Sequence, residues 1–226
     1  IVVFILTFSL PNRPSIKEIK SGNKALSWFA LSLVVVLFIL SMVNAWFFPI
    51  TESDAIWYHI RGISFYNEVQ FDSDLVVSQL QQYPPFIPLL FVYLIAFQAG
   101  FLKIFFPLLY LSLNVIFYSR VLYLTENKKI ACLFTMILAT TPYFWWHGIL
   151  PFLDLTTAVF YSTGILYWYF WIQSEIENST LNQKNSYGLV SGILLGLAAW
   201  TRIEFLLYDL VPVFLTILTF SRNRDK

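Results

Sequence analysis

The sequence ALSWFALSLVVVLFILSMVNAWFF, at residues 25–48, is an apolar run without a single charged side chain. A helix of about 20 apolar residues is long enough to cross the roughly 30 Å of hydrocarbon in a bilayer. The run therefore predicts a transmembrane helix, and it is the clearest such signal in the chain.

The composition agrees with a membrane protein. Of the 226 residues, 58% are hydrophobic and 12% are charged, whereas soluble domains carry about 25% charged residues. A mean hydropathy of +0.68 and a net charge of +1 also exclude a disordered chain and a nucleic-acid binder. The single cysteine, Cys132, allows no intrachain disulfide. Because the chain opens inside an apolar run without Met, we expect Ile1 to be a truncation.

Further apolar segments predict more helices, several of them short or containing proline, as in helices that line a protein-walled cavity. They cover residues 84–99, 104–124, 130–150, 152–172, 187–200 and 205–220. The predicted fold class is therefore all-α, a polytopic transmembrane helical bundle that forms a single domain over residues 1–226.

The distribution of basic residues predicts the orientation, because Lys and Arg concentrate in short cytoplasmic loops. Residues 11–24 carry four basic side chains against one acid, and the tail carries Arg222, Arg224 and Lys226, so both are expected in the cytoplasm. Residues 49–82 carry five acids against Arg61 and are expected outside. A basic cluster at Arg120, Lys128 and Lys129 conflicts with two spans between residues 84 and 124. Either one of the two apolar segments in this interval is re-entrant, or the preference of basic residues for the cytoplasmic side does not hold here.

The external segment ESDAIWYHIRGISFYNE, at residues 52–68, has helical amphipathic spacing. At about 100° per residue, Asp54, Tyr58 and Arg61 fall within about 60° of one another, and isoleucines occupy the opposite side. This pattern predicts a helix in the membrane interface with Trp57 as an anchor. Its polar face either meets a lipid-linked phosphate through Arg61 or is an ordinary solvated face.

The pattern DAIWYH at residues 54–59, followed by YPPFIPLL at residues 83–90, resembles the first external loop of the GT-C glycosyltransferases. The similarity is greatest to the protein O-mannosyltransferase and aminoarabinose-transferase branch, including its RgtA/B/C/D-like bacterial members. The resemblance implies that the loop 49–83 is catalytic, that Asp54 is the catalytic carboxylate, and that the proline segment opens the next membrane helix. Ala55 replaces the second acid that relatives often carry, and Tyr83 replaces their Lys or His. Substrate-binding roles in the loop are assigned to Tyr58, His59, Arg61 and Tyr83.

The resemblance continues through TTPYFWWHGILPFLDLTTAVFY at residues 140–161, where relatives place another acid at the start of an external helix. Asp154 occupies that position and is assigned as a second catalytic residue. The alternative is a carboxylate stabilised only by the dipole of its own helix. We interpret His147 as an interfacial hydrogen-bonding residue, because no His and Cys spacing is typical of zinc. No metal ligand or cofactor is assigned, although the family leaves a divalent metal possible.

Gly188, Gly192 and Gly196 lie at four-residue spacing and predict close packing of another helix. Arg202 and Glu204 follow, resemble a charged break in bacterial relatives, and are assigned to substrate binding. Asp209 lies two turns beyond Arg202. Two interpretations stay open: an internal ion pair that makes burial tolerable, or an arginine that binds the carrier phosphate.

The resemblance implies a glycosyltransferase that moves a hexose or pentose, with inversion, from a polyprenyl-phosphate donor to a lipid, glycan or protein acceptor. The reaction would take place on the non-cytoplasmic side of a prokaryotic plasma membrane, with membrane lipids around the protein and no nucleic acid. Asp54 would act as the base, and Arg61 or Arg202 would hold the phosphate. The competing class is a transporter or channel subunit whose charged residues line a polar pathway. A purely structural membrane subunit is the third possibility.

Overall fold

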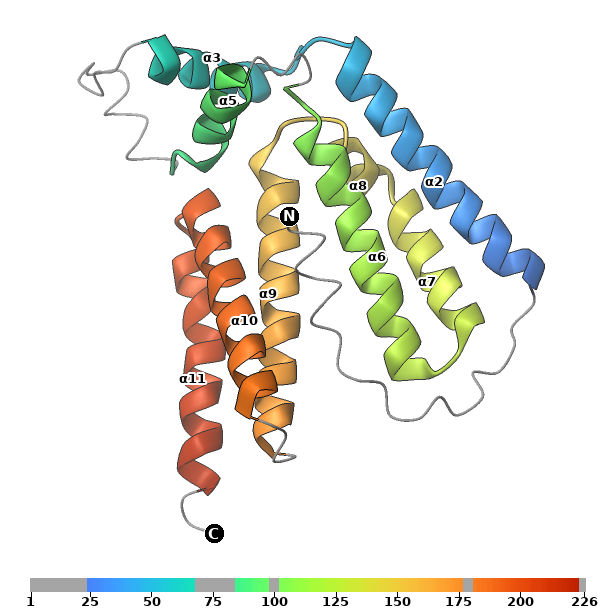
Figure 1. Ribbon diagram of the computed structural model, residues 1–226, viewed down its shortest axis with the longest axis vertical. Helices are drawn as coiled ribbons and strands as arrows, with labels where there is room; N and C mark the ends of the chain where they lie inside the picture. Colours follow the sequence, from blue (N-terminus) through green and yellow to red (C-terminus); the bar gives the residue numbers. More distant parts are fainter. Residues whose placement is uncertain (1–23, 68–83, 98–101, 177–180, 224–226) are drawn as a thin grey trace. The chain divides into compact units, whose positions relative to one another are not determined.

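The computed structural model describes residues 24–67, 84–97, 102–176 and 181–223, which are helical with short connections and contain no strand (Figure 1). This part of the chain confirms the predicted all-α class. The helices are α2 (Lys24–Phe47), α3 (Ser53–Asn67), α5 (Phe86–Ala96), α6 (Phe105–Thr125), α7 (Lys128–Thr140), α8 (Pro142–His147), α9 (Leu153–Ile176), α10 (Leu181–Thr201) and α11 (Phe205–Asn223).

The chain divides into two compact units. Among the described residues, the first unit contains α2, α3, α5 from Pro88 onward, α6, α7, α8 and residues 153–155 at the start of α9. The second contains Phe86 and Ile87, the rest of α9, α10 and α11. Each unit is described by itself below.

Two helices are long and apolar enough to cross a membrane, at Ala25–Phe47 and Phe105–Thr125. The first also carries exposed tryptophans near both ends, Trp28 at 68% and Trp46 at 53% exposure. Their separation along the helix is about 27 Å at 1.5 Å per residue, close to the thickness of the hydrocarbon layer. Trp is enriched at the two membrane interfaces, so this spacing fits a helix that spans from one interface to the other.

The length of helix α5 bears on whether two full spans lie between residues 84 and 124, which the basic cluster after them argues against. The helix has 11 residues, which gives a length of about 17 Å, roughly half of the hydrocarbon thickness. Helix α6 therefore provides the one full-length helix of the interval 84–124. Within the first unit, the α6–α7 turn and the start of α2 lie at the same end, and α3 and α5 lie at the other (Figure 1). Lys128 and Lys129, which are exposed in the first turn of α7, thus lie at the end of the unit where α2 begins. The short α5 fits the prediction that one of the two segments is re-entrant.

The core of the first unit lies where α6 contacts both α2 and α7. Tyr110 of α6 is fully buried there, and its hydroxyl donates to the backbone oxygen of Ala139 in α7 at 2.8 Å. At the end near α3, the buried Lys103 Nζ donates to Asn44 Oδ1 at 2.8 Å and to the Pro49 oxygen at 3.3 Å. Burial lowers the pKa of Lys103. This contact ties the residues after α2 to the start of α6.

The predicted continuous helix at residues 130–150 is wrong. Helix α7 ends at Thr140, Thr141 is extended, and α8 begins at Pro142. Proline lacks a backbone N–H and disfavours helical backbone at the residue before it, so it ends one helix and suits the first turn of the next. The break places a short aromatic helix, α8, between α7 and α9.

The second unit is held together by contacts from α9 to α10 and α11. A Cβ at Gly164 of α9 would lie 2.8 Å from Leu195 Cδ2 and 3.1 Å from the Leu195 backbone N. The Ser191 hydroxyl donates to the Gly164 oxygen at 2.9 Å. Trp168 Nε1 donates to Thr216 Oγ1 of α11 at 2.8 Å. Gly164 is therefore the glycine that lets α9 and α10 approach closely.

The predicted packing role of the α10 glycines is wrong for two of the three within the described residues. A Cβ at Gly192 or Gly196 would meet nothing within 4 Å. Gly188 makes ordinary van der Waals contact with Trp171, at 3.4 Å. Four-residue spacing identifies a small-residue face, but it does not establish that another helix covers it.

Candidate functional site

Helix α3 confirms the predicted interfacial segment as a helix, and Asp54 lies in its first turn. A carboxylate there is favoured by the positive end of the helix dipole. The helix packs on α5 through Gly62, where a Cβ would lie 2.7 Å from Phe91 Cβ and 3.1 Å from the Pro88 oxygen. The His59 ring meets Phe91 edge-on with centroids 5.4 Å apart. Close packing at Gly62 therefore fixes the helix that carries Asp54.

Helix α8 is anchored to the long helices of the first unit. Trp145 Nε1 donates to the Leu37 oxygen of α2 at 3.3 Å. The rings of Phe144 and Tyr110 of α6 lie 5.0 Å apart. Gly148, directly after α8, sits so close to Tyr110 that a Cβ would lie 3.0 Å from the tyrosine Cβ. These contacts place His147, the last residue of α8, against the core.

His147 and Asp154 form an ion-pair geometry across the loop between α8 and α9. His147 Nε2 lies 3.5 Å from Asp154 Oδ2. The other ring nitrogen, Nδ1, lies 2.8 Å from the Tyr143 backbone oxygen. The histidine is buried, whereas the Asp154 side chain is 39% exposed. Asp154 therefore presents its carboxylate both to His147 and to the space in front of it.

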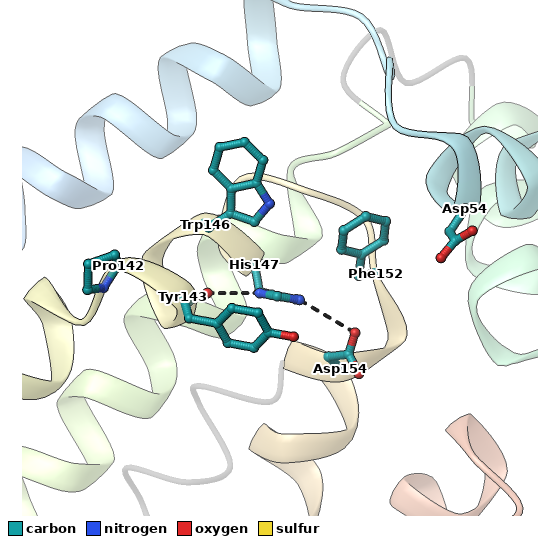
Figure 2. Close-up of a pocket in the computed structure, with 7 residues that line it drawn as sticks. All are labelled: Asp54, Pro142, Tyr143, Trp146, His147, Phe152 and Asp154. Carbon is teal, nitrogen blue, oxygen red and sulfur yellow. Dashed lines mark hydrogen bonds and ion pairs between the residues drawn. The ribbon is translucent and has the colours of Figure 1, made fainter.

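That space is an open pocket of about 640 Å³ in the first unit. Figure 2 shows His147 near Tyr143 and Phe152, with Nε2 toward Asp154, while Asp54 enters from α3 at another side of the pocket. The volume lies in the range of pockets that hold small molecules. Its lining combines two carboxylates and an imidazole with aromatic rings and a proline: Asp54, Pro142, Tyr143, Trp146, His147, Phe152 and Asp154.

The structure brings together the two acids that the sequence assigned as catalytic, Asp54 and Asp154, although they come from different helices. Whether either acid is catalytic stays a prediction. His147 was interpreted as an interfacial hydrogen-bonding residue; it does bond to a backbone carbonyl, but it also pairs with Asp154 and lines the pocket. Spacing along the chain could not reveal this pair, because the loop 148–152 folds back between its members.

Two environments were predicted for the Arg61 side chain: contact with a lipid-linked phosphate, or exposure to water on an ordinary solvated face. The second is wrong, because the side chain is buried. It is 6% exposed, and its Nε and Nη2 atoms are buried without hydrogen-bond partners in the described part of the chain. The guanidinium carbon lies 6.0 Å from the centre of the Phe65 ring. Burial lowers the pKa of Arg61, and the neighbouring Tyr58 opposes this shift. On the apolar side of α3, Ile60 and Ile63 are exposed.

Of the other residues assigned to substrate binding, Tyr58 and His59 belong to the first unit but do not line the pocket. Tyr58 and His59 are half-buried on α3, and burial lowers the pKa of His59. Tyr83 lies outside the described residues. Arg202 and Glu204 belong to the second unit, between α10 and α11. Among the described residues, Asp209 Oδ1 is buried without a hydrogen-bond partner. The two interpretations of Arg202, an internal ion pair and a phosphate-binding residue, both stay predictions.

No group of three or more His, Cys, Asp or Glu side chains in the described ranges is arranged to hold a metal ion. Comparison with protein-family models, with curated proteins and with solved structures gave no match for this chain. The chemistry of the site therefore has to be argued from its own residues.

Proposed function

We propose that the protein is a multi-pass membrane glycosyltransferase. It transfers a sugar from a polyprenyl-phosphate donor to an acceptor hydroxyl on the non-cytoplasmic side, with inversion. Asp54 accepts the hydroxyl proton as the oxygen attacks the sugar carbon, and the carbon–phosphate oxygen bond breaks with its electron pair going to the phosphate. Proton removal by a positioned carboxylate contributes about 10²–10⁴-fold in such reactions.

The observation that carries the proposal is the meeting of Asp54 and Asp154 in one pocket. The resemblance assigns a catalytic role to both, one on the external loop and one at the start of a distant helix. Carboxylate oxygens accept hydrogen bonds from hydroxyl groups, and the exposed rings of Tyr143 and Trp146 offer apolar faces beside them. Such a mixture suits a polyhydroxylated ring better than a charged phosphate.

A phosphate needs a cation, and the buried Arg61 on the same helix as Asp54 supports this part of the proposal. A guanidinium stays charged in proteins and matches phosphate oxygens with two parallel hydrogen bonds. Its Nε and Nη2 donors have no hydrogen-bond partner among the residues that the structure describes. Because an uncompensated buried charge is costly, an anionic group of the donor would satisfy these donors.

The distribution of charge supports an outward-facing site. The exposed Lys128 and Lys129 lie at the end of the first unit where α2 begins, and Asp54 lies at the other end (Figure 1). Basic residues mark the cytoplasmic end, so the pocket faces the non-cytoplasmic side. A prokaryotic plasma membrane is the location that we propose, on the strength of the resemblance.

Asp54→Asn tests the proposal. The change keeps the size of the side chain and removes the base, so transfer should fall by on the order of 10²-fold or more. Membrane vesicles containing the protein are supplied with radiolabelled polyprenyl-phosphate hexoses and pentoses, and label in lipid, glycan and protein fractions is measured. Glu52→Gln is the matched control, because Glu52 is near Asp54 but does not line the pocket. Equal transfer by the two variants would refute the role of Asp54.

A further inference from the structure

The hydrogen bond from His147 to Tyr143 fixes the protonation of one ring nitrogen. A backbone carbonyl oxygen can only accept a hydrogen bond. Because His147 Nδ1 lies 2.8 Å from the Tyr143 oxygen, Nδ1 must carry the proton in this bond. A neutral His147 therefore keeps its lone pair on Nε2, the nitrogen that faces Asp154.

The position of Asp154 makes that lone pair a favourable place for a proton. With neutral His147, the Nε2 lone pair faces the Asp154 Oδ2 atom at 3.5 Å, and two electron-rich atoms oppose each other. One added proton on Nε2 converts this contact into an attractive imidazolium–carboxylate pair. The His147–Asp154 pair can therefore take up one proton at the wall of the pocket.

We propose that His147 Nε2 is the proton acceptor of this pocket. This inference rests on the proposed transfer reaction, in which one proton leaves the acceptor hydroxyl in each cycle. Asp54 takes that proton, and it then passes through the pocket to His147 Nε2. His147 changes from imidazole to imidazolium, Asp54 returns to its carboxylate form, and Asp154 balances the new positive charge. The proton finally leaves Nε2 to water, because the pocket is open.

The groups around His147 fit this role. Tyr143, from α8, contacts the imidazole with ring centroids 4.1 Å apart, and Phe152 lies at 5.5 Å. The charged side chains that line the pocket are the two acids, Asp154 at the start of α9 and Asp54 on α3. An imidazolium at this wall of the pocket would therefore have carboxylates of two different helices in the same pocket.

A structural alternative explains only half of this geometry. Histidine near the end of a helix can simply satisfy a free carbonyl, and the bond from Nδ1 to Tyr143 would do that. Such a cap needs only one donor, Nδ1, and does not explain why Nε2 faces Asp154. The two roles can be separated because each uses a different nitrogen.

Nitrogen NMR tests the assignment directly. The chain contains two histidines, so ¹⁵N-histidine labelling of the 226-residue protein in lipid nanodiscs gives two sets of ring signals, and His59→Gln assigns them. We expect His147 Nδ1 to be protonated throughout a pH titration and Nε2 to gain its proton as the pH falls. At a fixed pH within that titration, Asp154→Asn should change the Nε2 chemical shift, because it removes the carboxylate that Nε2 faces, whereas Glu52→Gln should not. An Nε2–H tautomer with bare Nδ1, or no effect of Asp154→Asn, would overturn the proposal.

His147→Asn separates the proton acceptor from the cap. The asparagine amide nitrogen can take the place of Nδ1 and donate to Tyr143, but nothing replaces Nε2. We expect unfolding close to that of the unaltered protein, transfer reduced by on the order of 10²-fold, and loss of the pH-dependent limb of the rate. Unchanged rate and pH profile would leave His147 as a cap and refute the proposal. If even the unaltered protein transfers no sugar, the proposed function fails, and the NMR result still decides the protonation of His147.

Discussion

Polar side chains have different roles at the pocket end of the first unit and in the helix bundle of the second unit. In the first unit, the helical chain is interrupted at Thr141 and again after His147, and Asp54, His147 and Asp154 meet at the interruptions. In the second unit, α9 is unbroken, and polar side chains join it to its neighbours in the bond from Trp168 to Thr216 of α11 and in the bond from Ser191 of α10 to the Gly164 oxygen. An unbroken helix satisfies its own backbone, so its polar side chains are available to join neighbouring helices. Breaks between helices instead allow side chains from different helices to line one pocket.

The largest expected difference concerns the two ends of the first unit. In a Cys132→Ser background, Thr51→Cys should react with a membrane-impermeant maleimide added to intact cells, because it lies beside the pocket end. Lys128→Cys should react only after permeabilisation, because basic turns stay in the cytoplasm. Both residues are exposed in the structure. Labelling of Lys128→Cys in intact cells would contradict the predicted orientation, because it would place the α6–α7 turn outside the cell.

A glycine pair tests whether the second unit is a packed bundle. Gly164→Ala should destabilise it by about 1–3 kcal/mol, since the new methyl group would meet Leu195, including its backbone N. Gly192→Ala is the matched control, because its methyl group would meet nothing and Ala favours the helix by about 1 kcal/mol over Gly. Thermal unfolding in nanodiscs measures both. Equal effects would mean that α9 and α10 do not approach closely at Gly164.

The smallest expected effect lies on α3. Burial lowers the pKa of His59 in the folded protein, so the unfolded chain binds a proton more readily. The stabilising effect of keeping His59 neutral is therefore complete above the unfolded pKa of about 6.5 and is lost as the pH falls below it. Unfolding temperatures at pH 5 and pH 7.5 should differ less for His59→Gln than for the unaltered protein. An identical difference would mean that His59 is not buried against Phe91.

Much of the helical pattern could be predicted from the sequence, because apolar runs and their ends reflect local chemistry. The sequence predicts a helix at residues 52–68, and a helix is found at Ser53–Asn67. Its place in the membrane interface stays a prediction. Helical angles also placed Asp54, Tyr58 and Arg61 on one side. They could not tell whether water or protein covers that side, and burial of Arg61 depends on contacts made after the chain has folded.

The errors have a common physical origin in long-range contacts. The apolar run at residues 130–150 concealed the break at Pro142, since hydrophobicity continues through it. Gly192 and Gly196 have the spacing of a packing face, yet Gly164 makes the close contact because Leu195 of α10 lies against it. The His147–Asp154 pair depends on how a loop folds back, which no helical period encodes.

The central claim is that Asp54 and Asp154 belong to one reaction site, and a double-mutant cycle tests it most directly. Sugar transfer is measured for Asp54→Asn, Asp154→Asn and the double variant under the same donor conditions. Residues that act as a unit give strongly non-additive losses. The account predicts that the double variant is about as impaired as the more severe single variant. Losses that multiply would contradict it, because they would show that the two carboxylates act independently.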